Sequence, residues 1–577
     1  MRTLFKNAKI YDGTGNASFY GDVLVDGERI VSVQASPNDA AVQATPSDLQ
    51  SSPNDAAVQS SPNDSAVQSI PSDLATSPND LQATTPSDCE VIDLQGLSLA
   101  PGFIDAHSHN DWFAIRKDPS KYFEPFIRQG ICSFVTGNCG LSAIGFEPDS
   151  PNADKVGGGL FSYSDAKGTF PSAASFFDAV DGHSPCNIAT LVGHCSARAS
   201  VSGYENRPLT PEEHKRMLDI LETSLKEGAA GVSLGLMYEP GIYAPTEELR
   251  SIVSLCEKYD RPLTVHPRAC SAVSMDYPLL GRPHLLRALD ELVEICSGTK
   301  VKLEYSHAIF VGRKSFKCKD ELVQILHQLR DTGVDAGFDI YDELLGVSTI
   351  TVVLPAWFRS LSPAQKRNPW VRFKLSVLIK ATIILLGFDF SDIQIAYIGP
   401  GYEKYEGHSV HEIAVSEGRS DLDMYLELCE LSGFAGRVNM GPYSTPEIVS
   451  ELSRDPLCLY MTDAWVEDHG VQNPAIYDCF PKFLKHSLEG SGDTMPATVR
   501  KMSAAVADRF QLKDRGYIRE GAYADLTVFD EATLLAGVPD KGASFGIEKV
   551  YINGHKVLDG GHIFEESLHC GHAISCK

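Results

Sequence analysis

The sequence predicts an α/β protein: an elaborated (β/α)₈ barrel of the TIM type with a small β-sandwich domain built from both chain ends. Apolar runs alternate with helical stretches between residues 99 and 512, which is typical of parallel strands joined by crossover helices. Short strands with turn signals lie on either side of this region. We therefore expect a barrel over 99–512 and a small β domain from 1–98 and 513–577.

The N-terminal part of the small domain consists of short apolar runs at 4–10, 22–25 and 29–33. Asp26-Gly27 between the last two is a hairpin turn signal. The pattern resumes at 89–94, and the tail supplies similar runs at 516–518, 524–529 and 550–554. Neither end is large enough to form a core alone, so we expect the two ends to meet in one domain.

Residues 35–88 are a low-complexity insertion. Ser-Pro-Asn-Asp-Ala-Ala-Val-Gln recurs from Ser36 and Ser52, with a near copy from Ser61. The segment has many prolines and no aromatic residue, Lys or Arg, so it cannot bury enough apolar surface to offset the entropy of ordering it. We expect a disordered surface loop between two strands, and the alternative is a tether that binds a partner.

The barrel region offers a series of strands and helices. An apolar run at 97–104 leads into this region. The candidate strands that come after it are 131–135, 188–192, 231–234, 263–265, 301–305, 334–338, 393–398 and 457–461. Its candidate helices are 211–226, 246–259, 285–295 and 320–331.

Composition limits the classes of partner. The formal net charge of −26 disfavours nucleic acid and anionic membranes, since both need a positive face. No apolar stretch is long enough to span a bilayer, and the N-terminus has no signal-peptide core. The 14 scattered cysteines fit reduced thiols in the cytoplasm better than a disulfide framework. A small-molecule substrate is compatible with this composition, which does not indicate the oligomeric state.

Residues able to bind a metal recur just past the predicted strands. Pro-Gly-Phe-Ile-Asp-Ala-His-Ser-His at 101–109 ends an apolar run, and residues i and i+2 of a strand face the same side. This alternation would point His107 and His109 to one place. The other residues able to bind a metal at predicted strand ends are Cys139, His266, His307 and Asp463.

This set of side chains suits zinc-assisted hydrolysis of an amide. Thiolate and imidazole favour zinc, and a carboxylate completes the set. A zinc-bound water loses its proton near neutral pH, and a nearby carboxylate can accept that proton. Any one of these residues alone is more often an ordinary buried polar group, so the hypothesis depends on their joint position at strand ends.

Several of these motifs resemble the amidohydrolase superfamily, within it the D-aminoacylase (N-acyl-D-amino-acid deacylase) branch. They are the 101–109 segment, Thr-Gly-Asn-Cys-Gly at 136–140, Val-His-Pro-Arg at 265–268, Ser306-His307, Met-Thr-Asp at 461–463 and the segment 231–241. The similarity extends to the closing motif at 521–526.

The resemblance implies a zinc-dependent (β/α)₈ barrel that hydrolyses a non-peptide C–N bond, with an N-acyl-D-amino acid as the nearest named substrate. It implies that Cys139, His266 and His307 hold one tight zinc. His107, His109 and Asp463 would line a weaker second metal position, with Asp463 as general base. It also implies substrate contacts from Arg268 and Tyr238.

The sequence departs from this branch at three expected substrate anchors. Ile309 replaces a lysine, Glu343 replaces a tyrosine, and Ala475 replaces an arginine. The substrate, its stereochemistry and the number of metals therefore stay open. The alternatives are a hydrolase of cyclic amides, such as hydantoins or dihydropyrimidines, and a catalytically silent relative that binds a ligand or partner.

The composition of the repeat yields a first prediction. Deleting residues 36–87 should leave turnover and the melting temperature nearly unchanged, because a segment without packable side chains adds little to the core. Thermal denaturation and steady-state kinetics of the deletion variant measure this. A large loss of thermal stability would show that the segment is packed.

Overall fold

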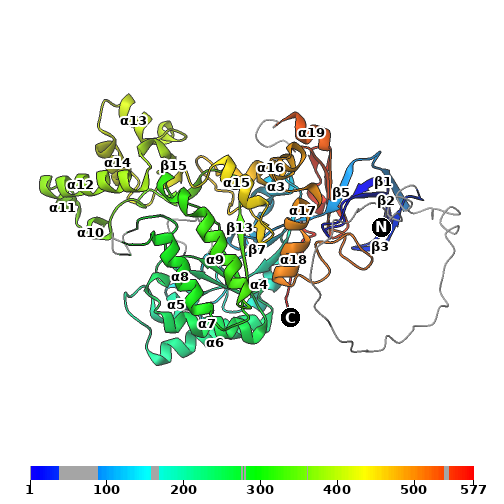
Figure 1. The fold of residues 1–577 in the computed structure, drawn as a ribbon, viewed down its shortest axis with the longest axis horizontal. Helices are drawn as coiled ribbons and strands as arrows, with labels where there is room; N and C mark the ends of the chain where they lie inside the picture. Colours follow the sequence, from blue (N-terminus) through cyan, green and yellow to red (C-terminus); the bar gives the residue numbers. More distant parts are fainter. Residues whose placement is uncertain are drawn as a thin grey trace, which may run out of the picture.

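The computed structural model describes residues 2–37, 89–156, 168–274, 277, 281–359, 361–537 and 545–577. Its described parts are a barrel, a β-sheet that joins the chain ends, and an insertion with its own core (Figure 1). The predicted repeat at 35–88 lies almost wholly outside the described residues. No helix in the described ranges is long and apolar enough to cross a membrane.

The sheet at one end of the molecule contains strands from both chain ends (Figure 1). Parallel and antiparallel pairs hold it together, and β18 lies antiparallel to β5 with Thr527 opposite Ala100. Phe5 faces the core with Val23, and after a register shift between Phe5 and Ala8 the alternation resumes with Ala8 and Ile10 facing the same core. The strands are β1 (Arg2–Ile10), β2 (Phe19–Asp26), β3 (Arg29–Ala35), β4 (Cys89–Asp93), β5 (Ser98–Pro101), β18 (Leu526–Phe529), β19 (Ile547–Ile552), β20 (His555–Asp559) and β21 (His562–Ile563).

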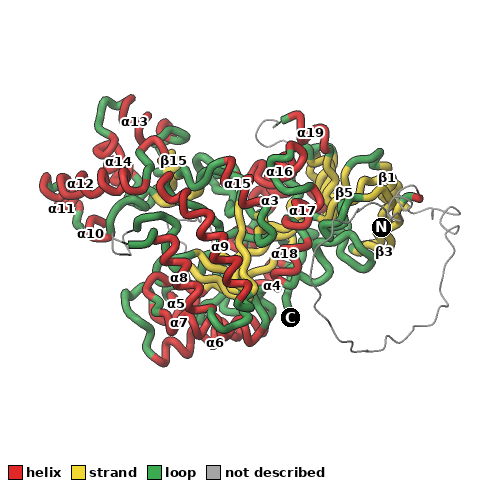
Figure 2. The backbone as a smooth tube through the Cα atoms, viewed as in Figure 1, coloured by secondary structure: helices red, strands yellow, loops and turns green. Residues whose placement is uncertain are grey.

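Parallel strands form the barrel at the centre of the molecule (Figure 2). In chain order they are β6 (Phe103–Asp105), β7 (Ile131–Thr136), β8 (Asn187–Thr190), β9 (Val192–Gly193), β10 (Val232–Gly235), β11 (Leu263–His266), β12 (Lys302–Tyr305), β13 (Asp335–Ile340) and β17 (Cys458–Tyr460). Two parallel sheets run from β6 to β8 and from β9 to β17. Hydrogen bonds bring their ends together: Leu191 N donates to Thr136 O at 2.9 Å, and Ala106 N to Tyr460 O at 3.3 Å.

Helices surround these strands, and the four predicted helices are confirmed. Thr210 starts α6 as expected, because its side chain accepts a hydrogen bond from Glu213 N and Glu213 returns one to the Thr210 backbone. The barrel helices are α2 (Asp111–Ala114), α3 (Ser120–Ile127), α4 (Ala173–Val180), α5 (His194–Ser202), α6 (Pro211–Glu227), α7 (Thr246–Tyr259), α8 (His284–Cys296), α9 (Lys319–Asp331), α15 (Pro446–Ser453), α16 (Ala475–Glu489), α17 (Met495–Lys501) and α18 (Ala504–Phe510), and α19 (Glu531–Ala536) follows β18.

Two strand predictions need correction. The run at 97–104 is two strands, β5 and β6, separated at Gly102, where an added Cβ would lie 2.4 Å from Cys132 Sγ. His107 and His109 therefore follow the strand in a loop instead of alternating along it. The run at 393–398 is not a barrel strand: β15 (Ile393–Tyr397) pairs antiparallel with β16 (Arg437–Met440) in another sheet.

The sheet formed by β14 (Gly346–Thr349), β16 and β15 belongs to an insertion between β13 and β17. This insertion lies at the opposite end of the molecule from the sheet that joins the chain ends (Figure 1). An apolar run of strand length does not reveal which sheet it joins, which explains the wrong assignment of 393–398. Ile395, Val438, Leu375 and Tyr425 pack in a core of its own. Its other elements are α10 (Ala356–Arg359), α11 (Pro363–Lys366), α12 (Pro369–Leu386), α13 (Val410–Ser416) and α14 (Asp421–Leu431).

A buried ion-pair cluster beside the barrel gives a stability prediction. The Glu248 carboxylate accepts hydrogen bonds from His194 Nε2 at 2.7 Å and Arg198 Nε at 2.9 Å. Burial alone would raise the pKa of Glu248, but His194 and Arg198 together lower it below its usual value. Glu248→Gln should reduce the free energy of unfolding by about 3–5 kcal/mol near neutral pH, because Arg198 is left as an uncompensated buried charge.

The pH dependence of this loss has a defined sign. A depressed folded-state pKa adds stability above the unfolded Glu pKa of about 4.3, and that stability disappears as pH falls through the folded value. The difference between wild type and Glu248→Gln should therefore shrink below about pH 4 in denaturant titrations. Glu247→Gln, at the exposed neighbouring position, is the control. Equal stabilities of the two variants would contradict the assigned role of Glu248.

Candidate metal centre

The residues expected to bind metal meet at one end of the barrel. His107 and His109 follow β6, Cys139 follows β7, His266 ends β11, and His307 follows β12. Asp463 comes three residues after β17. Because parallel barrel strands all end on the same face, side chains far apart in sequence converge there. The structure thus brings together all six residues predicted to hold metal.

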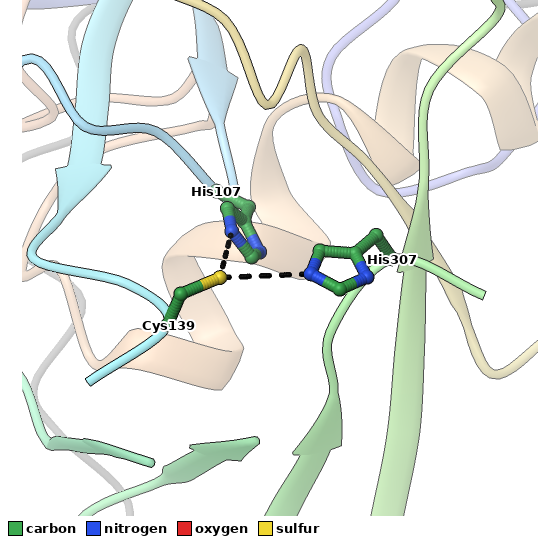
Figure 3. Close-up of side chains that lie close together, drawn as sticks. All are labelled: His107, Cys139 and His307. Atoms are coloured by element: carbon green, nitrogen blue, oxygen red, sulfur yellow. Dashed lines mark hydrogen bonds between the residues drawn. The ribbon is translucent and has the colours of Figure 1, made fainter. Parts of the chain in front are cut away.

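The Cys139 thiol is at the centre of this group. Its Sγ lies 3.4 Å from His107 Nε2, 3.6 Å from His266 Nδ1 and 3.5 Å from His307 Nε2. Figure 3 shows the sulfur between the His107 and His307 rings, which reach it from separate strand ends. All four side chains are buried. The sulfur therefore lies within 3.6 Å of all three ring nitrogens, but only those of His107 and His307 form with it a set of ligand atoms that all lie within 4.8 Å of one another.

Asp463 completes the group on the side of His107 and His109. Its Oδ1 lies 3.5 Å from His107 Nε2 and 3.5 Å from His109 Nε2. Ligand atoms lie within 4.8 Å of one another in two sets, His107/Cys139/His307 and His107/His109/Asp463. His107 belongs to both sets. The Asp463 side chain keeps 24% of its surface exposed, so one edge of the carboxylate faces the adjoining cavity.

Three of the converging residues hold an uncommon backbone conformation. Cys139 has φ of +54°, His307 of +36° and Asp463 of +46°. A non-glycine residue in the left-handed region costs on the order of 1–3 kcal/mol and persists only where the surroundings enforce it. One such restraint acts at Thr462, whose N and Oγ1 donate to the buried Asp105 carboxylate at 3.0 and 2.5 Å. The loops thus turn these side chains inward at an energetic cost.

Asp339 supports the cluster, and the sequence interpretation did not assign it this role. Its Oδ2 lies 3.2 Å from His107 Nδ1, and its Oδ1 accepts the His307 backbone N–H. A metal-binding histidine usually engages a carboxylate or carbonyl through its other ring nitrogen, which fixes the tautomer and the ring orientation. The only signal in the sequence was an acidic residue near the end of a predicted strand.

The electrostatics and chemistry of the cluster fit a divalent cation. Burial raises the pKa of the Cys139 thiol to about 11, and burial and His307 lower that of His266 well below its usual value. Burial also favours the neutral form of Asp463, but His107 and His109 lower its pKa overall and keep it ionised. Neutral imidazole, carboxylate and the cysteine sulfur are the side-chain groups that zinc binds.

A cavity of about 460 Å³ opens over the cluster. Asp463, Cys139 and His307 line it on the barrel side, and residues 346–349 and Met440 of the insertion line it elsewhere. Tyr238 is also in the lining, with its hydroxyl 3.4 Å from His266 Nδ1. The insertion therefore forms part of the wall of the space that a substrate would enter.

Arg268, expected to contact substrate, is not among the residues that line this cavity. Its guanidinium binds both carboxylate oxygens of Glu291 at 3.0 and 2.9 Å and donates to Ile242 O at 2.6 Å. These contacts hold the loop after β11 against α8. The sequence placed Arg268 close to His266, but a spacing of two residues does not determine where a long side chain points.

The three departures from the expected anchors lie in different surroundings. Ile309 lines the cavity as an apolar residue. The Glu343 carboxylate pairs with Lys482, and Ala475 is buried at the start of α16. The cavity wall at Ile309 thus offers an alkyl group where a cation was expected.

Comparisons with known proteins agree with the fold and the motifs. The model of the amidohydrolase family matches residues 90–256. D-aminoacylase of Alcaligenes xylosoxydans xylosoxydans is 28% identical over 480 residues, covering 81% of this chain and 85% of that protein. N-acyl-D-glutamate deacylase of the same organism is 27% identical over 485 residues, with 83% and 87% covered.

A solved structure extends the comparison to the whole fold. It is N-acyl-D-glutamate deacylase from Bordetella bronchiseptica, complexed with zinc and a phosphonate inhibitor, with a TM-score of 0.72, 21% identity and 99% of each chain covered. The fold of this chain is therefore similar to that of this deacylase. Over most of its length the chain is also similar in sequence to D-aminoacylase and N-acyl-D-glutamate deacylase, which agrees with the resemblance of its motifs.

The position of Asp339 gives a testable prediction. Asp339→Asn should weaken zinc binding about 10- to 100-fold, because His107 and His307 lose the charged partner that orients them. Competition with a chromophoric chelator measures the affinity. Asp335→Asn is the matched control, since Asp335 lies on the same strand and pairs with Arg330 and Arg509 away from the cluster. Equal zinc affinity in both variants would remove Asp339 from the site.

Proposed function

We propose that this protein is a zinc-dependent amidohydrolase that cleaves a non-peptide C–N bond, with an N-acyl-D-amino acid or a related N-acyl compound as substrate. The observation that carries the proposal is the convergence of Cys139 with His107, His266 and His307, beside Asp463 and under a cavity. Relatives that match over most of the chain are named for deacylation of N-acyl-D-amino acids, and this supports the choice of substrate class.

The proposal gives each residue of the cluster a role. Cys139, His266 and His307 hold one tight zinc, because a thiolate and two imidazoles leave the fourth position open. His107, His109 and Asp463 line a second, weaker position, which Cys139 is close enough to share. Zinc bound by this cluster would act as a Lewis acid, which polarises the scissile carbonyl and makes water more acidic.

The protein's own part in the reaction is proton transfer and positioning. Asp463 takes a proton from the attacking water at its carboxylate and delivers it to the nitrogen of the leaving amine. Its partly exposed edge toward the cavity suits both transfers. Tyr238 places a hydroxyl beside His266 at the cavity wall, within reach of a bound acyl compound.

The cysteines support a location for this chemistry. Each of the 14 cysteines is a free thiol, and most are buried. Thiols stay reduced in the cytoplasm, so we place the protein there.

Metal analysis combined with a substrate panel tests the proposal. Purified protein should contain about one tightly bound zinc per chain. The zinc-loaded protein should release amino acid from N-acyl-D-amino acids faster than from their L-isomers, and should leave hydantoin and dihydrouracil intact. Ring opening without deacylation would replace the proposal with cyclic-amide hydrolysis. Absence of zinc, with no turnover after zinc is added, would refute it.

Asp463→Asn separates proton transfer from metal binding. The variant should keep the tight zinc, because Cys139, His266 and His307 remain, but turnover should fall by roughly 10²- to 10⁴-fold, since an amide cannot accept the proton. Zinc content and kcat of the same preparation measure both effects. Asp468→Asn, five residues away and bonded to Lys121, is the control. Near wild-type kcat in Asp463→Asn would exclude Asp463 as the base.

A further inference from the structure

Two cationic side chains line the cavity away from the metal-binding cluster. Lys155 ends a short 3₁₀ helix (Ala153–Lys155) in the segment after β7, and Arg359 ends α10 of the insertion. Both residues are exposed, whereas Cys139 and His307 at the other end of the same cavity are buried. Lys155 and Arg359 therefore lie at the mouth of the cavity and the metal ligands at its floor.

Neither cation has an acidic partner in the described part of the chain. Most other arginines in the described ranges pair with a carboxylate, as Arg367 directly after α11 does with Glu430. Glu239 also lines the cavity, but its carboxylate accepts the Tyr243 hydroxyl at 2.9 Å and forms no ion pair with Arg359 among the described contacts. Two long cationic side chains thus line one cavity, and neither forms an ion pair with any residue that the structure describes.

The rest of the cavity wall is neutral near the metal-binding floor. Ile309 and Met440 are apolar, and burial raises the pKa of the Tyr341 and Tyr443 hydroxyls well above the usual value, so both stay neutral. An anionic group on a substrate therefore finds no lysine or arginine at the floor. The favourable place for it is the mouth, where a carboxylate can accept two N–H donors from one guanidinium and a third from an ammonium.

We propose that Lys155 and Arg359 form an anion-binding subsite that holds a carboxylate of the substrate while the amide lies at the cluster. This rests on the proposed function and narrows its substrate to N-acyl compounds with a negative charge remote from the scissile bond. Arg359 belongs to the insertion and Lys155 to the barrel, so a bound carboxylate would bridge the two parts. Although the chain carries a net charge of −26, the field at the mouth is locally positive and favours entry of anions.

The test compares a compound that has a side-chain carboxylate with the corresponding side-chain amide. N-acetyl-D-glutamate and N-acetyl-D-glutamine differ only in this group, which is remote from the scissile bond, so the subsite should distinguish them. Arg359→Gln and Lys155→Gln should each raise KM for the acid on the order of tenfold, the loss expected for one charge-assisted hydrogen bond, with kcat unchanged. The KM for the amide should not move, and Arg359→Lys should recover part of the lost affinity.

Arg367→Gln is the matched control, because Arg367 directly follows α11, the next helix of the insertion, and is absent from the cavity lining. Added salt should weaken binding of the acid to wild type and have little effect on the double Gln variant. Equal KM changes for acid and amide, or none, would overturn the subsite.

A binding measurement separates this inference from the proposed function. Isothermal titration calorimetry of the zinc-loaded protein with N-acetyl-D-glutamate gives a Kd that does not depend on turnover. Binding that weakens in Arg359→Gln but not in Arg367→Gln supports the subsite, even if neither compound is hydrolysed. Turnover without such a difference would keep the proposed function and refute the subsite. Absence of binding to wild type would refute the subsite as well.

Discussion

The site depends on the common direction of the barrel strands. Since β6, β7, β11, β12 and β17 run parallel, their carboxyl ends lie on one face, and residues as distant in sequence as His107 and Asp463 become neighbours. The Ala106–Tyr460 hydrogen bond brings the first strand beside the last. This contact holds the loop after β6, which supplies His107 and His109, beside Asp463 in the loop after β17.

Buried carboxylates hold this arrangement in place. Asp105 binds Thr462 through both its oxygens and so ties the loop after β17 to β6. Asp339 connects β13 to His107 and to the backbone of His307. Each acid is nearly inaccessible to solvent and is compensated by donors from other strands. The left-handed conformations of Cys139, His307 and Asp463 are tolerated because these contacts leave the loops no relaxed alternative.

The barrel and the insertion line different parts of the cavity. The barrel provides Asp463 and the clustered histidines and cysteine, whereas residues 346–349, Arg359 and Met440 of the insertion line other parts of the cavity. The insertion packs around its own core of apolar side chains. Changes on the cavity-facing side of the insertion can therefore alter which substrate is accepted without disturbing the cluster. This suits a chain that retains all six metal-site residues and has Ile309 at an expected anchor.

The sequence by itself indicated the fold class and the residues that converge in the cluster. Alternating apolar runs and helix starts such as Thr210 are local signals, and motifs such as Thr-Gly-Asn-Cys-Gly mark strand ends directly, so Cys139, His266 and Asp463 were identifiable. A local sequence pattern does not determine which strand a given strand pairs with. The run at 393–398 has the composition of a barrel strand, yet it pairs with β16 in the insertion.

Only the tertiary structure decided which long side chains reach the cavity. Arg268, adjacent to a metal-site motif, binds Glu291, whereas Lys155 and Arg359, far from any motif, line the mouth. Asp339 gained its role in the same way, because contact with His107 and His307 depends on the folding of three separate strands. Side-chain direction and long-range contact are fixed by packing, which no short stretch of sequence contains.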